Sequence, residues 1–278
     1  MKKLFLVSTC IALSLTLPST FIFAAGLTTK DHTNYPIDKA TESVIKQKEQ
    51  LVSLYDQLKA GKIPEKTYKD ALDSFNRSVS KSNTTISPSI ALASSGHIPL
   101  YTSNYIYNLY QQAQINSYYC GPATVSSMLN AKSVGVGQST AASSLGTTTN
   151  GTDWYNGSGY PVRNTLNNYL NTSWYAPYGT SIDVSTFISN VTFDIDNSYS
   201  VAGDAYEVVN GYHLVGHPNA NIFHWFAIDG YSNSGNSTHY ADSVHGASSI
   251  SWSGNVPAYS TMDSSIIARI VDGRGIIW

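Results

Sequence analysis

A β-hairpin pattern in the last third of the chain most limits what this sequence can fold into. In the run HWFAIDGY, residues 224–231, the side chains of His224, Phe226 and Ile228 would share one face of an extended strand. The stretch SNSGN follows it, and THYADSV, residues 238–244, is a second strand-like run. Two such runs joined by a short turn of Asn, Ser and Gly predict an antiparallel hairpin. The domain that contains them is therefore expected to hold a sheet.

Helical patterns precede this hairpin. A helix is expected to begin near Cys120, because Pro122 suits a first helical turn and an apolar stripe with helical spacing follows it. Shorter helices are expected over residues 162–170 and after Asp183, a suitable N-cap residue. The end of the chain, residues 262–278, is typical of a short helix and a final strand. Helices first and strands afterwards predict a domain of the α+β class.

A different unit lies ahead of this domain. Residues 26–76 predict a helical hairpin: apolar residues have helical spacing over 43–59, Gly61 is placed to end that helix, and a second apolar face runs over 68–75. A pro-segment, a spacer and a solvated hairpin without a catalytic role all fit this pattern. The Ser-rich residues 77–97 show no periodicity and predict a linker.

The N-terminus has the layout of a secretory signal peptide. Lys2 and Lys3 precede an apolar run over residues 4–17, and small residues follow at Ala24 and Ala25. A membrane span needs about 20 apolar residues, and this run is shorter. We therefore expect a signal peptide over the first 25 residues and a secreted protein, with an uncleaved N-terminal anchor as the alternative. No later apolar run approaches that length, so no membrane association is expected after signal removal.

The two units of the exported chain differ in net charge. Residues 27–96 hold ten Lys or Arg and eight Asp or Glu, a balance of +2, whereas residues 97–278 hold four and ten, a balance of −6. Neither unit carries the basic patch that phosphate backbones require, so nucleic acid is not an expected partner. The second unit, about 180 residues long and rich in Tyr, Asn, Ser and Gly, has the usual size of one extracellular domain.

Cys120 is the strongest candidate for a chemically reactive residue. The other cysteine, Cys10, falls within the expected signal peptide, so export would leave a single thiol. An intramolecular disulfide and a multi-thiolate metal site are then excluded, and a lone cysteine is either buried and inert or retained for its reactivity. A helix N-terminus favours the thiolate, because its unpaired N–H groups and its dipole stabilise negative charge.

Partners for such a thiolate occur at suitable places. Gln114 lies six residues before Cys120 and could fold back to offer a neutral amide donor to an oxyanion. His224 begins a buried strand, where packing would fix its ring for general base work. Asp242 lies 18 residues after His224, and a hairpin would bring its carboxylate alongside the ring.

This set of residues resembles a known family, the papain-like cysteine peptidases, and within them the bacteriocin-processing double-glycine peptidases (cysteine peptidase family thirty-nine and its relatives). QINSYYCGPATVSSML carries Gln114 and Cys120, HWFAIDGY carries His224, and Asp242 follows. The stretch GTDWYNGSGYPVRNTLNNYL is similar to the family's middle segment, and the resemblance spans residues 98–278. It implies an N-terminal helical part that carries the cysteine helix and an antiparallel sheet that carries histidine and aspartate.

The resemblance also implies roles: Cys120 as nucleophile, His224 as general base and acid, Asp242 as its orienter and Gln114 as oxyanion donor. Two departures stand out. Family members often place proline after the aspartate, where this chain has Ser243, and Asp229 is a lesser rival that strand parity points away from His224. Since no transporter segment follows, the chain resembles a free secreted member, and a double-glycine substrate is not implied.

We therefore predict a secreted cysteine peptidase or amidase that acts on a peptide or protein without a cofactor. A catalytically inactive papain-like binding module at the cell surface and a transglutaminase-like acyl transferase are the alternatives. The 20 Tyr and 5 Trp also fit association with cell-wall material.

His213 and His217 have zinc-ligand spacing, but no zincin-type Glu lies between them and the surrounding Gly and Pro argue against a helix, so no metal is expected. The substrate, the oligomeric state and removal of residues 26–97 are not specified by the sequence.

Overall fold

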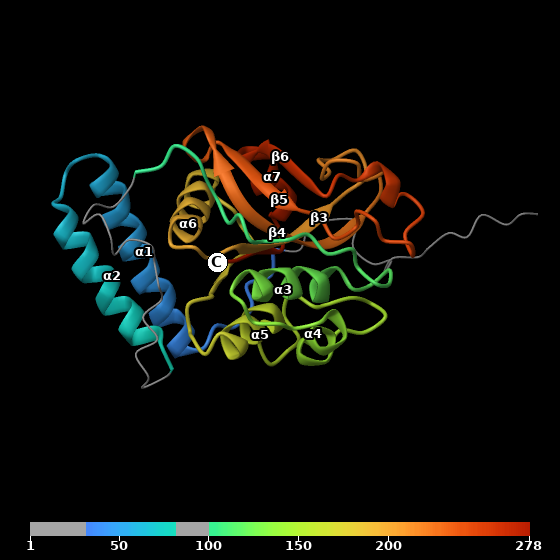
Figure 1. Cartoon of the computed structure of the whole chain (residues 1–278), viewed down its shortest axis with the longest axis horizontal. Coiled ribbons are helices and arrows are strands. Elements are labelled where there is room, and N and C mark those ends of the chain that lie inside the picture. Colours follow the sequence, from blue (N-terminus) through green and yellow to red (C-terminus); the bar gives the residue numbers. More distant parts are fainter. Residues whose placement is uncertain (1–31, 82–99) are drawn as a thin grey trace, which may run out of the picture.

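A seven-stranded antiparallel sheet forms the centre of the computed structural model, which describes residues 32–81 and 100–278 (Figure 1). The strand order is β2-β7-β3-β4-β5-β6, and β1 pairs with β4 off this path. The strands are β1 (Asn104–Tyr105), β2 (Pro177–Tyr178), β3 (Val201–Glu207), β4 (Ile222–Ser232), β5 (Ser237–Ala241), β6 (Tyr259–Asp263) and β7 (Gly275–Ile277). The predicted signal peptide and most of the predicted linker lie outside the described residues.

The predicted hairpin is the pair β4 and β5, in which Ala227 lies opposite Ala241. The β5 strand ends at Ala241, so Asp242 is the first residue beyond it rather than part of a strand that extends to residue 244. A register shift between Ile228 and Gly230 bends β4 near its far end. The carboxylate after β5 therefore lies in a loop beside the start of β4.

Helices cover the sheet as the predicted α+β class requires. They are α3 (Cys120–Ala131), α4 (Gln138–Leu145), α5 (Pro161–Tyr169), α6 (Val184–Asp196) and α7 (Ser264–Val271). The α3 helix packs on β4 and contacts α4 and α5. The α6 and α7 helices pack on each other, with α6 also on β4 and β3 and α7 on β3. Figure 1 shows α3, α4 and α5 grouped together below the sheet. The α+β prediction is confirmed, and so is the Asp183 cap, whose carboxylate accepts from the Thr186 N–H at 2.8 Å.

The N-terminal hairpin consists of α1 (Lys39–Lys59) and α2 (Glu65–Val79). Gly61 has a φ of +67° just after α1, as expected of a residue that ends a helix. The α2 helix continues to Val79, past the predicted boundary at residue 76, because its exposed polar residues Arg77 and Ser78 belong to the outer face of an amphipathic helix. Val79 in turn accepts a hydrogen bond from the Ser173 N–H at 2.8 Å, which ties the end of α2 to the sheet domain.

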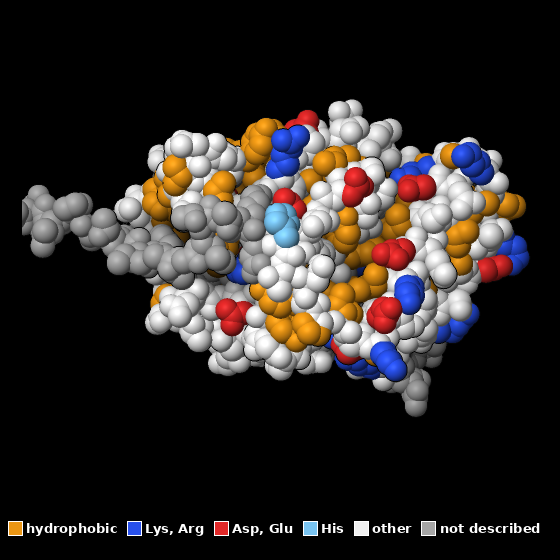
Figure 2. Space-filling model, turned by 180° about the vertical axis from the view of Figure 1, so that it is seen from behind, with side chains coloured by type: hydrophobic (Ala, Val, Ile, Leu, Met, Phe, Trp, Pro, Cys, Tyr) orange, Lys and Arg blue, Asp and Glu red, His pale blue; other side chains and the backbone are white. Residues whose placement is uncertain are grey.

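Charged side chains are unevenly spread over the surface. On the face shown in Figure 2, Lys and Arg side chains alternate with Asp and Glu side chains, mostly towards the hairpin end, and the described residues form no continuous basic surface there. None of the helices within residues 32–81 and 100–278 combines the length and apolar character needed to cross a membrane.

Candidate active site

Cys120 is the first residue of α3, and its side chain is largely buried against the sheet. No side chain caps this helix, so the N–H groups of its first turn are not engaged by a capping group. The Thr124 hydroxyl, one turn later, donates to the Trp225 carbonyl of β4 at 3.0 Å. The sequence therefore places the sulfur at an uncapped helix N-terminus held directly on β4, where negative charge is favoured.

Gly121 is required by the close approach of α3 to the neighbouring loop. A Cβ at this position would lie 2.4 Å from Thr152 Oγ1 and 2.7 Å from Thr152 Cβ. The loop cannot easily retreat, because its Thr152 carbonyl accepts from Trp225 Nε1 at 3.0 Å.

We expect Gly121→Ala to lower the free energy of unfolding by about 1–3 kcal/mol, the usual cost of overpacking, and to reduce activity by displacing the Cys120 sulfur. Gly135→Ala is the matched control, since a Cβ added at that position would have no neighbouring atom within 4 Å. Urea unfolding of both variants checks the prediction. Equal stability of the two variants would contradict a close contact at Gly121.

His224 lies on β4 with only 3% of its surface exposed. Its Nε2 lies 2.9 Å from Asp242 Oδ1, so Nδ1 is the ring nitrogen that the carboxylate does not engage. Burial alone would lower the pKa of His224, but the charge of Asp242, the hydrogen bond to it and the neighbouring Cys120 raise that pKa well above its usual value. The ring is therefore held between the Asp242 carboxylate and the Cys120 thiol, and the catalytic roles predicted for these residues stay predictions.

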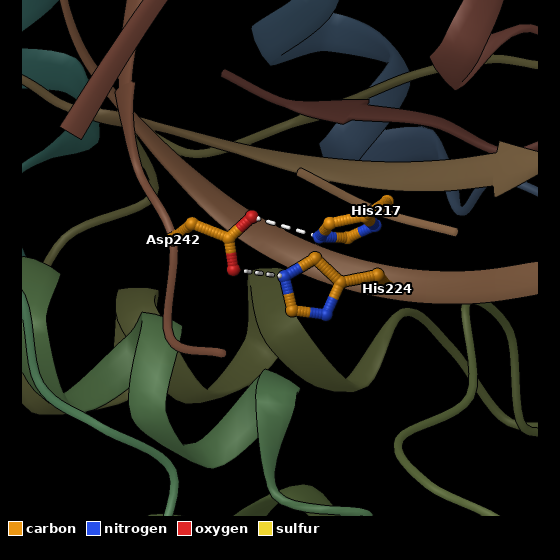
Figure 3. A group of neighbouring side chains, drawn as sticks. All are labelled: His217, His224 and Asp242. Atoms are coloured by element: carbon orange, nitrogen blue, oxygen red, sulfur yellow. Dashed lines mark hydrogen bonds and ion pairs between the residues drawn. The ribbon is translucent and has the colours of Figure 1, made fainter. Parts of the chain in front are cut away.

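Asp242 is the shared acceptor of this region. Its Oδ1 also accepts from the Val244 N–H at 2.9 Å, and its Oδ2 lies 3.0 Å from His217 Nε2 (Figure 3). Burial would raise the pKa of the Asp242 carboxyl, but the charge on His224 and the hydrogen bonds from His217 and His224 hold that pKa far below its usual value. Asp229, the rival carboxylate, lies 2.6 Å from His239 Nδ1 instead.

Gln114 is buried beside the loop that follows Asp242. Its N–H donates to the Ser243 carbonyl at 2.8 Å, and the Ser243 hydroxyl donates to Gln114 Oε1 at 3.1 Å. Gln114 Nε2 donates to the Asn116 carbonyl at 2.8 Å, which uses one of its two hydrogens. Ser243, the departure from the family pattern, thus fixes which way the Gln114 amide faces. The role of Gln114 as an oxyanion donor stays a prediction.

The structure brings in two residues that sequence reasoning missed. His217 shares Asp242 with His224, and its ring centroid lies 5.2 Å from that of His224. Glu207, the last residue of β3, is fully buried, with an oxygen 2.8 Å from His217 Nδ1. In the sequence, His217 stood out only as half of a possible zinc pair with His213. The signal that could have found the pair was an acidic residue that ends a fully buried strand, because such a group needs a partner.

Three of the residues described above, His217, His224 and Asp242, form a group that could hold a metal ion. One ligand atom each from His217, His224 and Asp242 lies within 4.8 Å of the others among the described residues. In the arrangement seen here, both Asp242 oxygens and the facing nitrogen of each ring already pair with one another. The prediction that no metal is used stays a prediction.

A cavity of about 260 Å³ opens beside the site. Its walls include Ser117, three residues before Cys120, and Ile222, two residues before His224. Trp252 joins them and contacts His217, with ring centroids 4.8 Å apart. The Oγ of Ser249, another wall residue, is buried without a partner in the described part of the chain.

Comparison with known proteins gives one match at the level of families. The model of the peptidase C39-like family matches residues 105–262, more than half of the chain. A crystal structure described as that of a C39-like peptidase from Bacillus anthracis has 12% sequence identity and a TM-score of 0.41, and the match covers 63% of this chain and 96% of that one. Among curated proteins, none matches this sequence.

Proposed function

Because this chain belongs to the peptidase C39-like family, we propose that it is a cysteine peptidase that cleaves peptide or amide bonds with Cys120, His224, Asp242 and Gln114. One observation carries the proposal: His224 is buried between the Asp242 carboxylate and the thiol of Cys120, which begins a helix. That arrangement stabilises a thiolate next to an imidazolium, which is the reactive form of a cysteine nucleophile.

The steps of the reaction follow from these positions. The Cys120 thiolate attacks the carbonyl carbon, and the resulting oxyanion lies between the Cys120 N–H and the remaining N–H of Gln114 Nε2. The tetrahedral intermediate collapses, the C–N bond breaks, and His224 gives its proton to the leaving amine. Water, deprotonated by His224, then attacks the thioester and releases the acid and the thiol. Asp242 keeps the ring in the tautomer that places Nδ1 towards the sulfur.

Cleavage of a peptide library by the purified exported chain tests this proposal. New amino termini, detected by mass spectrometry, should form in the untreated sample and be lost after alkylation of Cys120, the single cysteine of residues 26–278. Identical products after alkylation, or none in the untreated sample, would contradict it. Incorporation of an added amine in place of hydrolysis would instead identify an acyl transferase.

We also propose that the protein acts outside the cell, on the strength of the signal-peptide pattern in its first 25 residues. The intact mass of the protein recovered from culture medium tests this location. A mature chain that begins near residue 25 or 26 would support export and cleavage. A chain that begins at Met1 would contradict them.

A further inference from the structure

His217 is enclosed by two buried carboxylates. Its Nδ1 lies 2.8 Å from Glu207 Oε1, and its Nε2 lies 3.0 Å from Asp242 Oδ2. The three side chains have exposures of at most 1%. Trp252 packs against the ring from the side of the cavity. Water has little access to this group, so its protons must be shared among the three residues.

The carboxylates that face the ring decide how many protons it carries. Each carboxylate accepts from one backbone N–H and faces two imidazoles: Asp242 accepts from Val244 and faces His224 and His217, and Glu207 accepts from Leu214 and faces His213 and His217. The 2.8 Å approach of Nδ1 to Glu207 lacks hydrogen-bond geometry, so it is an ion-pair contact. An ionised carboxylate has no hydrogen to donate, so two carboxylates that face the two nitrogens of one ring favour its doubly protonated form. Such a ring is an imidazolium.

The electrostatic balance at this position agrees with the geometry. Burial alone would lower the pKa of His217, but its hydrogen bond to Asp242 and the close contact and charges of Glu207 and Asp242 raise that pKa above the usual value. The pair Glu207 and His217 is then neutral overall, with its positive end towards Asp242 and His224.

We propose that His217 is a positioning residue: held by Glu207 as a permanent imidazolium, it fixes Asp242 and limits how strongly that carboxylate retains the proton on His224. This inference rests on the proposed function, because the proton on His224 is the one given to the leaving amine. An orienting carboxylate that faced His224 alone would hold this proton more tightly and slow its transfer.

Several charged or titratable groups interact with the two rings or with the carboxylates beside them. They are Glu207 and Asp204 on β3, His213 in the loop before β4, Tyr240 on β5, Asp242 after β5, Cys120 on α3, and Arg274, which pairs with Asp204. Among these groups, His217 is the cation that shares a carboxylate oxygen pair with His224. A cation opposes a second positive charge nearby, so removing it should raise the pKa of His224.

The paired variant Glu207→Gln/His217→Gln tests the proposal, because it removes both charges and leaves no buried charge alone. The side-chain amide that replaces the His217 ring can still donate to Asp242 and hold its position. We expect the alkaline limb of kcat/KM to move to higher pH by about one unit. The rate at which the anionic reagent iodoacetate alkylates Cys120 should show the same shift, because the His224 imidazolium attracts this reagent. His213→Gln is the matched control, since it removes the other imidazole of Glu207 and should leave both limbs in place.

The outcomes separate the alternatives. A purely structural role would lower activity or stability without moving either limb, and an unmoved or downward-moved limb would overturn the proposal. The alkylation rate reports on His224 even if no peptide is cleaved, so failure of the proposed function is distinguishable. If the paired variant does not fold, nitrogen chemical shifts of His217 in the wild type at about pH 8, above the usual pKa of histidine, decide: two protonated nitrogens support the proposal, and one overturns it.

Discussion

We expect Asp242→Ala to reduce kcat/KM about 10³- to 10⁴-fold, the loss typical of removing the group that orients a catalytic histidine. The carboxylate is the acceptor that faces His224 Nε2, so its removal frees the ring to rotate and to adopt the wrong tautomer. It also removes the acceptor of the Val244 N–H, which shapes the loop beside Gln114. Steady-state hydrolysis of a peptide identified in the library experiment measures the effect.

Asp229→Ala is the matched control for this prediction. Asp229 is also a buried carboxylate of the β4–β5 hairpin, but it pairs with His239, so its loss should change kcat/KM only a few-fold. Asp242→Asn should fall between the two, because it keeps one acceptor oxygen for two imidazoles. Circular dichroism and a cooperative urea transition confirm that each variant is folded. A large loss in Asp229→Ala with none in Asp242→Ala would assign the orienting role to the rival carboxylate.

Local patterns in the sequence predict the parts of the site that lie on regular elements. The period of two in HWFAIDGY places His224 on a strand, and Pro122 marks the start of the Cys120 helix, because each depends on residues only a few positions apart. The short turn after β4 brings Asp242 beside His224. The structure places these residues together with Gln114, and their catalytic roles stay predictions.

The other parts of the fold and of the site depend on contacts between residues far apart in the sequence, which local patterns do not predict. His217 lies in an irregular loop before β4, and its position beside Asp242 arises only when that loop closes over the sheet. The α4 helix, QSTAASSL, consists mainly of small residues and has no strong apolar stripe. The hydrophobic pattern of the sequence therefore did not predict it. The predicted hairpin of residues 26–76 gave no sign that one of its lysines would be buried in another unit.

That lysine carries the second large prediction. Lys48 of α1 is fully buried, with its Nζ 2.8 Å from Asp194 Oδ1 on α6 and 4.1 Å from the ring centre of Trp278. Burial lowers the pKa of Lys48 to about 8, against the opposing charge and hydrogen bond of Asp194. We expect Lys48→Met to lower the free energy of unfolding by about 3–5 kcal/mol, because it leaves the buried Asp194 carboxylate without its closest cation.

The paired variant Lys48→Met/Asp194→Leu separates the charge from the packing. A buried ion pair can often be replaced by apolar groups of similar volume without loss, so this variant should recover most of the stability, whereas Lys46→Met on the exposed face of α1 should leave the urea midpoint unchanged. If Lys48→Met alone were as stable as the wild type, the hairpin would not depend on this pair for its attachment. The expected result instead makes residues 39–79 a part of the folded domain, because their removal would expose Asp194 and the rings that Lys48 covers.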